Sequence, residues 1–285
     1  MKRPIPYSIN ANGKLIDLSV PKVMGILNVT PDSFYAASRA EEETAITNRV
    51  IQVMEEGADI IDIGACSTRP GASIATPQEE MERLRKGLKI IRELYPEAIV
   101  SVDTFRADAA RMSVEEYGVQ IINDVSGNFL QEGSCTTVAA LNAPYILTHN
   151  EGIPQTTKNV VHDVNVVREM LLFFAEKTQL LRNKGVKDII IDPGFGFAKT
   201  LEQNYAIMQH LEEFRLLELP ILIGVSRKSM IHELLRTTPE QALNGTTVLN
   251  TIALMKGANI LRIHDVKACV ETVKIIQTLQ DQQLC

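Results

Sequence analysis

The chain has 285 residues, of which 45% are hydrophobic and 22% are charged, and this is an ordinary globular composition. Its 29 Lys and Arg residues against 35 Asp and Glu residues give a net charge of −6, which does not suggest general nucleic-acid binding. The chain lacks an uninterrupted apolar span, a secretory signal and a CxxC pair. We therefore expect a cytoplasmic protein with no nucleic-acid or membrane partner.

The N-terminal segment, residues 1–22, comes before the first strongly apolar run. It contains an Asn12-Gly13 pair, which is typical of a tight turn between two antiparallel strands. We predict a short β-hairpin over residues 1–22 that closes the bottom of a following unit, which spans residues 23–285.

Eight short runs rich in Val and Ile then recur along the chain with helical stretches between them. The runs cover residues 23–29, 59–64, 99–104, 119–125, 145–149, 188–192, 221–226 and 259–264. They are almost continuously apolar, which favours a parallel sheet that is covered on both faces. Eight such βα units predict a single-domain α/β fold, the (β/α)8 TIM barrel. A doubly wound open sheet is the alternative.

The connections after the strands are longer than those before them. Residues 30–40, 65–76 and 150–162 all follow strands, at the end of the barrel where active sites are built. We therefore looked for polar residues at the C-terminal ends of the strands. These are Asn28, Asp103, Asn123, Asp192, Arg227, Lys228, Arg262 and His264.

The cations of this set come from the last two strands, where barrels commonly bind phosphate. The amides and carboxylates suit a ligand with several N–H donors, or Mg²⁺. Two members have other readings, because Asp103 could cap the next helix and Asp192 could start a turn. Asp124 must face away from Asn123, and we expect Asp62 to be an internal partner rather than a catalyst.

Seven ordered motifs around these residues resemble the dihydropteroate synthase family. They are ILNVTPDSF (26–34), DIG (62–64) followed by STRPG (67–71), SVDT (101–104), INDV (122–125), DPGFGF (192–197), GVSRKS (224–229) and RIHD (262–265). Together they cover residues 23 to 265, nearly the whole chain.

The resemblance implies a homodimeric transferase of folate and tetrahydrofolate biosynthesis. The family joins 6-hydroxymethyl-7,8-dihydropterin diphosphate to p-aminobenzoate, gives 7,8-dihydropteroate and diphosphate, requires Mg²⁺ and is a sulfonamide target. We expect ionisation of the C–O bond before attack by the arylamine, an SN1-like order, with electrostatic stabilisation of the leaving group.

The resemblance also implies roles for individual residues. Asp103, Asn123, Asp192 and Lys228 are expected to bind the pterin. Asn28, Arg69, Arg262 and His264 are expected to bind the diphosphate, with Asn28 also the metal ligand. Phe34, Thr68, Arg69, Pro70, Phe197 and Ser229 are expected to form the p-aminobenzoate pocket. Asp192, Lys228, Arg262 and His264 are the catalytic set.

Three segments depart from the family pattern, namely residues 35–38, Ala65-Cys66 and residues 148–151. They leave the expected pterin and diphosphate residues in place. Two other readings stay open. One is a pterin-binding methyltransferase domain, which is not expected to combine the 67–70 and 226–229 motifs. The other is a non-catalytic pterin-binding paralogue, which only the altered loops support.

Overall fold

The computed structural model describes residues 5–30, 39–66, 75–127, 134–150 and 165–282. Its main sheet has eight strands, every neighbouring pair of which is parallel. The strands are β3 (Lys22–Asn28), β4 (Ile60–Gly64), β5 (Ile99–Asp103), β6 (Ile121–Asp124), β7 (Tyr145–Thr148), β8 (Ile189–Asp192), β9 (Leu222–Ile223) and β10 (Ile260–Ile263). Their order is β8-β7-β6-β5-β4-β3-β10-β9. An isolated parallel bridge between Ile191 and Ile221 joins the two ends of this order, so the predicted barrel is confirmed.

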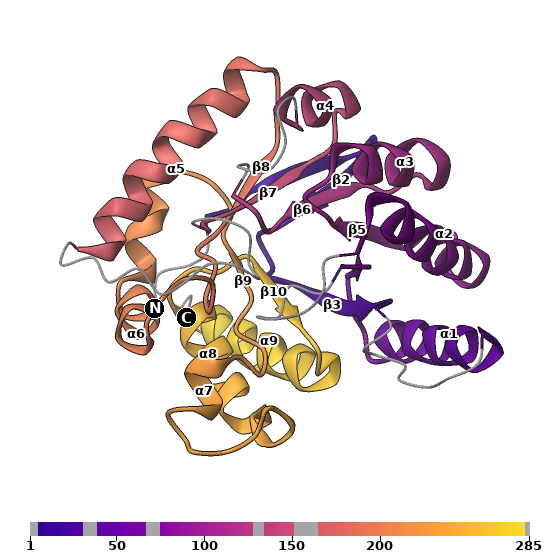
Figure 1. Cartoon of the computed structure of the whole chain (residues 1–285). Helices are drawn as coiled ribbons and strands as arrows, with labels where there is room; N and C mark the ends of the chain where they lie inside the picture. The colour runs from indigo at the N-terminus through magenta and orange to yellow at the C-terminus, as the bar shows by residue number, and fades with distance from the viewer. Residues whose placement is uncertain (1–4, 31–38, 67–74, 128–133, 151–164, 283–285) are drawn as a thin grey trace.

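Helices surround the sheet, and Figure 1 looks along the barrel from the C-terminal ends of the strands. They are α1 (Arg39–Glu55), α2 (Pro77–Leu94), α3 (Ala107–Tyr117), α4 (Ser134–Leu141), α5 (Val166–Asn183), α6 (Leu201–Gln209), α7 (Ser229–His232), α8 (Leu243–Met255) and α9 (Val266–Asp281), with 3-10 helices η2 (Leu211–Leu217) and η3 (Pro239–Gln241). Local chemistry fixes their ends. Thr76 and Glu79 form a reciprocal capping box at the start of α2, and Gly118 ends α3 in the left-handed region.

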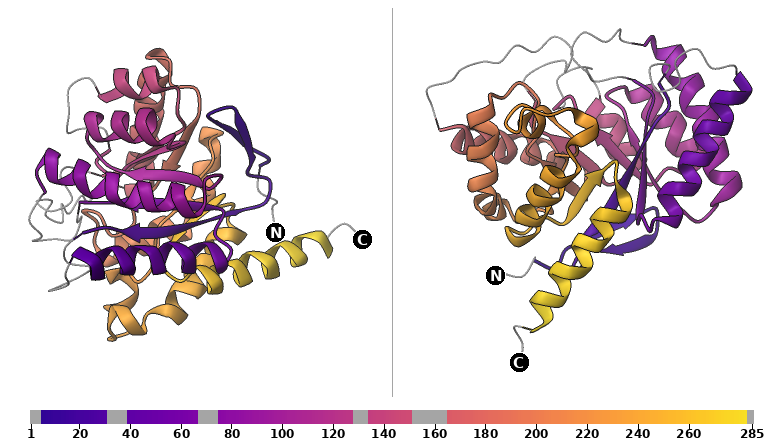
Figure 2. Two further views of the ribbon diagram at one scale, coloured as in Figure 1. Left: turned by 90° about the vertical axis from the view of Figure 1, so that its right-hand side faces the viewer. Right: turned by 90° about the horizontal axis from the view of Figure 1, so that it is seen from below.

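The predicted N-terminal hairpin is present as β1 (Ser8–Ala11) and β2 (Lys14–Asp17), with Asn12 and Gly13 at positive φ in the turn. It lies across the end of the barrel at which the strands begin, the end from which helix α9 also projects (Figure 2). Buried side chains of the hairpin pack against the lowest layer of the barrel interior. This cluster includes Ile9, Ile16 and Leu18 from the hairpin side and Met24, Ile60, Ile121, Ile146, Ile190, Leu222 and Ile260 from the strands. The hairpin therefore plugs the bottom of the barrel, and a ligand must enter from the other end.

One strand is shorter than the sequence predicts. The apolar run 221–226 yields only the two-residue strand β9, because the chain turns soon afterwards, with the Lys228 N–H donating to the carbonyl of Val225. Within the described residues, none of the helices is both long and apolar enough to cross a lipid bilayer.

Candidate active site

The barrel interior changes from apolar to polar one layer above the plugged floor. Side chains two residues apart on a strand share a face. The layer above Ile60, Ile121 and Ile260 therefore holds Asp62, Asn123 and Arg262, and Asp62 accepts a hydrogen bond from each of the other two. The same spacing above Ile146, Ile190 and Leu222 places Thr148, Asp192 and Gly224 in this layer. The floor of the site is thus largely polar, apart from Ile26 and Gly224, and the sheet itself positions it.

Arg262 connects the carboxylates of this layer. Its Nε donates to Asp62 Oδ2 at 2.6 Å, and its Nη2 donates to Asp103 Oδ2 at 2.5 Å. Burial opposes the charged form of Arg262, but the two carboxylates outweigh it and raise the pKa of the guanidinium. Arg262 is therefore a fixed cation that lies beside one of the predicted pterin residues.

Asp103 and Asp192 sit at the C-terminal ends of β5 and β8. Asp103 does not cap the following helix, because α3 starts at Ala107 and its N-cap residue is Arg106. Asp192 does form the alternative turn, since its Oδ1 accepts from the Gly194 N–H at 2.8 Å. Burial raises the pKa of Asp103 to about 7 against the lowering effect of Arg262. Burial also raises the pKa of Asp192, against the lowering effect of Lys228. Both carboxyl groups are thus poised to accept a proton or a hydrogen bond.

Lys228 lies close to Arg262 although it comes from the loop after β9. Its Nζ donates to the Phe195 carbonyl at 2.5 Å and stands 4.5 Å from the centre of the Phe197 ring. A Cβ built on Gly224 would be 3.9 Å from Lys228 Nζ and 4.0 Å from Arg262 Cδ, so both cations flank this glycine. Burial lowers the pKa of Lys228 to about 8, although Asp192 opposes the shift.

His264 follows β10 directly and is held by Ser226. The Ser226 hydroxyl accepts from the His264 backbone N–H at 3.1 Å and lies 2.9 Å from its Nδ1. Burial and the charge of Arg262 lower the pKa of His264 to about 4, so the ring is neutral at pH 7. It can offer a neutral ring N–H next to a fixed cation.

The remaining expected site residues fall into two groups. Asn28 is the last residue of β3 and is paired with Gly64, Phe197 follows β8, and Ser229 is the first residue of α7. Phe34, Thr68, Arg69 and Pro70 lie outside the described residues. Asn28, Phe197 and Ser229 thus come from the C-terminal ends of three different strands or the segments that follow them.

Arg227 does not belong to the cationic group, which corrects the sequence expectation. Its backbone has a φ of 56°, and its guanidinium pairs with Asp265 at 2.6 Å and also donates to the carbonyls of Pro239 and Glu240. It fastens the α7–η3 segment to the end of β10. The adjacent Lys228 provides the cation at the mouth instead.

Several polar residues of the inner layer were not singled out as ligand-binding residues by the sequence. Asp62 was expected as an internal partner, and the structure makes it the partner of both Arg262 and Asn123. Ser101 and Thr148 are buried, and their hydroxyls make no hydrogen bond within the described part of the chain. The signal that finds them is their position two residues after an inward-facing isoleucine. Asp124 does face outward, where it accepts from the Tyr145 hydroxyl at 2.5 Å.

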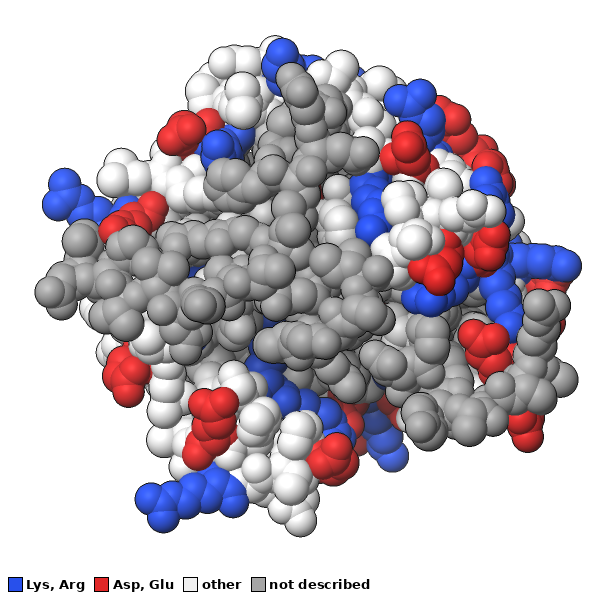
Figure 3. Space-filling model, in the orientation of Figure 1, with Lys and Arg blue, Asp and Glu red and all other residues white. Residues whose placement is uncertain are grey.

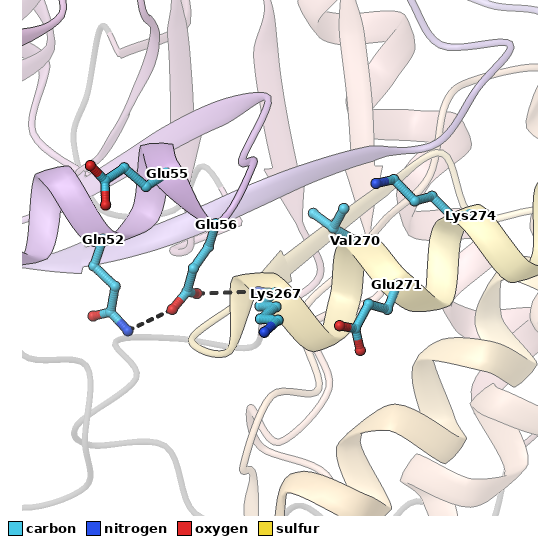
Figure 4. Close-up of a pocket in the computed structure, with 7 residues that line it drawn as sticks. All are labelled: Gln52, Glu55, Glu56, Lys267, Val270, Glu271 and Lys274. Carbon is cyan, nitrogen blue, oxygen red and sulfur yellow. Dashed lines mark hydrogen bonds between the residues drawn. The ribbon is translucent and has the colours of Figure 1, made fainter.

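Features elsewhere are less suited to a planar phosphorylated ligand. A groove between α1 and α9 on the outer wall is lined by charged side chains and contains none of the expected site residues (Figure 4). Over the described part of the face in Figure 3, acidic and basic side chains alternate around the circumference without an extended basic surface. No cluster of three or more His, Cys, Asp or Glu residues suited to a metal is found among the residues that the structure describes.

Comparison with known proteins matches the same region. Residues 24–264 fit the family model "Pterin binding enzyme". The dihydropteroate synthase of Escherichia coli K12 is 37% identical over 269 residues, which is 94% of each chain. A Yersinia pestis dihydropteroate synthase in complex with a sulfonamide drug superposes with a TM-score of 0.89 at 34% identity, covering 97% of this chain and 100% of that one. A Xanthomonas albilineans dihydropteroate synthase with bound 7,8-dihydropteroate gives 0.86 at 33% identity, covering 96% and 99%.

Proposed function

Because the chain belongs to the pterin-binding enzyme family and, within it, to the dihydropteroate synthases, we propose how its own residues carry out that reaction. The chain is a transferase of folate biosynthesis that condenses 6-hydroxymethyl-7,8-dihydropterin diphosphate with p-aminobenzoate. The observation that carries the residue assignment is the meeting of Arg262 and Lys228 around Gly224, next to Asp103 in one barrel mouth.

The pterin ring is proposed to lie on the polar layer. Asp103, Asn123 and Asp192 present carboxylate and amide oxygens from strands β5, β6 and β8, which is what the N–H groups of a pterin edge require. The Nζ of Lys228 lies within reach of the same layer.

The diphosphate is proposed to bind above the pterin, beside Arg262 of β10 and His264, the residue that follows this strand. The Arg262 guanidinium supplies a charged pair of N–H donors. His264 supplies a neutral N–H donor, and its protonation does not change near pH 7 because its pKa is lowered to about 4. Arg69, which lies outside the described residues, is expected to complete this group. Together these donors stabilise the negative charge that develops on the leaving oxygen.

Mg²⁺ is a proposed cofactor whose protein ligand is Asn28. One amide oxygen at the end of β3 fits this ion, since Mg²⁺ commonly keeps several waters and shares substrate phosphate oxygens rather than needing a full protein cage. When bound, the ion would neutralise diphosphate charge and favour departure of the leaving group.

We propose that departure of the diphosphate precedes attack by p-aminobenzoate. The electron-rich pterin carries the resulting cation, and the Asp192 carboxylate stabilises it through the N–H edge of the ring. No enzyme nucleophile is required. Phe197 and Ser229, with Phe34, Thr68 and Pro70 outside the described residues, are proposed to form the p-aminobenzoate and sulfonamide pocket. A homodimeric state and a cytoplasmic location also belong to this proposal.

The test supplies the pterin diphosphate, p-aminobenzoate and Mg²⁺ and follows dihydropteroate and diphosphate release. We expect product, and we expect chelation of Mg²⁺ by EDTA to remove most of the rate. Pterin binding without product would support the non-catalytic paralogue. Methyl transfer from a methylated folate to an acceptor, without dihydropteroate formation, would support the methyltransferase reading.

A further inference from the structure

We propose that Asp62 is a positioning residue that holds Arg262 at the mouth and couples the diphosphate-binding end of the site to the pterin-binding end. This inference rests on the proposed function, because it gives Asp62 a part in the same reaction. The proposed effect of Asp62 is exerted through the two side chains that it contacts, Arg262 and Asn123.

The first observation is the unequal placement of the two carboxylates that hold Arg262. Asp62 lies in the fully buried layer of β4, and its side chain is 0% exposed, whereas the Asp103 side chain is 11% exposed and stands one layer nearer the mouth. A ligand that enters from the mouth therefore reaches Asp103 first. Once Asp103 Oδ2 accepts hydrogen bonds from a pterin, the contact at 2.5 Å to Arg262 Nη2 has to be shared or given up.

Asp62 then becomes the remaining anchor of the guanidinium. It binds Nε at 2.6 Å, which leaves both terminal nitrogens of Arg262 available to turn toward an anion above the ring. Loss of this carboxylate would leave the Arg262 side chain with more rotamers to sample. The guanidinium would then lose more conformational entropy when it binds phosphate.

The second observation is that the same oxygen of Asp62 also contacts Asn123. Asn123 Nδ2 donates to Asp62 Oδ2 at 3.2 Å, which fixes which end of the amide points away from Asp62. The opposite atom, Asn123 Oδ1, is buried and accepts no hydrogen bond from any residue that the structure describes. One carboxylate thus orients a diphosphate-binding cation and presents an acceptor to the pterin.

The test is a double-mutant cycle of Asp62→Asn and Arg262→Gln, with kcat and KM measured for each substrate. Asparagine keeps the shape of the side chain and removes its charge. We expect Asp62→Asn to lower kcat/KM for the pterin diphosphate about 10- to 100-fold and to change the KM for p-aminobenzoate by less than about threefold. In the Arg262→Gln background, the same substitution should cost clearly less than in the wild type, because only the contact with Asn123 is then lost. Equal losses in both backgrounds would overturn the proposal.

Asp124→Asn is the matched control, because Asp124 is also a buried carboxylate of a barrel strand but faces outward to Tyr145 and Ser126. Its effect should be a loss of stability that adds independently to that of Arg262→Gln. If Asp62→Asn does not fold, Asp62→Glu, which keeps the charge and displaces it by one methylene, replaces it in the cycle.

The wild-type protein is assayed first, so that the two proposals can fail separately. If the wild-type protein turns over and the effects of the two substitutions are additive, the role of Asp62 is rejected and the proposed function stands. If the wild-type protein binds the pterin diphosphate without turnover, the proposed catalytic function is rejected. The double-mutant cycle is then measured on binding affinity by calorimetry. Wild-type protein that does neither overturns both.

Discussion

Replacing Gly194 by alanine perturbs the segment that connects Asp192 to Phe197. Gly194 has a φ of +67°, a region that residues with a Cβ rarely adopt. A Cβ at this position would lie 2.2 Å from the His149 carbonyl oxygen and 3.0 Å from Thr148 Cγ2. The carbonyl is not easily moved, because it accepts from the buried Lys199 Nζ at 3.1 Å, and Lys199 also donates to the Gly194 carbonyl.

The cost can be worked out from these two effects. A left-handed conformation costs an alanine about 1–2 kcal/mol. Forcing extra volume against a well-packed neighbour adds about 1–3 kcal/mol. We therefore expect Gly194→Ala to lower the free energy of unfolding by about 2–5 kcal/mol. Turnover should fall as well, because the Gly194 N–H donates to Asp192 Oδ1 and any backbone shift moves that carboxylate.

Urea denaturation of Gly194→Ala and Gly118→Ala tests this reasoning. Gly118 has a similar φ of +61°, but a Cβ there would meet nothing within 4 Å. The control should lose only the conformational part, about 1–2 kcal/mol, and keep full turnover. Equal losses in the two variants would refute the argument that the His149 carbonyl excludes a side chain.

Further predictions concern Lys228 and Tyr145. Lys228→Ala should abolish dihydropteroate formation while its circular dichroism stays that of the folded barrel, and wild-type turnover would contradict the pterin assignment. Because the pKa of Lys228 is lowered to about 8, the ammonium loses its proton as the pH rises through that value, so pterin affinity measured by calorimetry should fall there and a flat profile up to pH 10 would disagree. Tyr145→Phe removes the donor to buried Asp124 and should cost about 1–3 kcal/mol of stability in a denaturant titration, with kcat unchanged.

The sequence was most informative where one physical cause dominates. The run 188–192 has isoleucines on both faces, so a covered parallel sheet follows, and Asn12-Gly13 specifies a turn by its backbone preferences alone. Strand length is less predictable. The run 221–226 predicts a full strand, yet its pairing ends after Ile223. The turn that follows is held in part by a contact distant in sequence, in which the Arg227 N–H donates to Thr246 Oγ1.

The site residues likewise divide into those whose position the sequence predicts and those whose position it does not. The position of Asp103, Asn123, Asp192 and Arg262 at strand ends is enough to bring them together, because parallel strands end at one edge of the barrel. Residues after the strand end are different. Arg227 and Lys228 are adjacent cations, and only the backbone turn with φ of 56° at Arg227 decides which of them faces the mouth. No spacing rule in the chain contains that information.

The polar layer explains how a closed barrel can carry carboxylates in its interior before any ligand binds. An unpaired buried carboxylate is strongly disfavoured, so Asp62 and Asp103 need a cation, and Arg262 supplies it from β10, which is separated from β4 by β3 alone. A guanidinium and the N–H edge of a pterin offer a carboxylate similar planar pairs of donors. On the proposed assignment, pterin binding at Asp103 would exchange one planar donor for another, which would bring little net stabilisation by itself. The Arg262 nitrogen that loses its contact with Asp103 would regain a charged partner only when an anion is present. The proposed site therefore favours the diphosphate ester over the unesterified pterin, because only the ester supplies both N–H donors for Asp103 and an anion for Arg262.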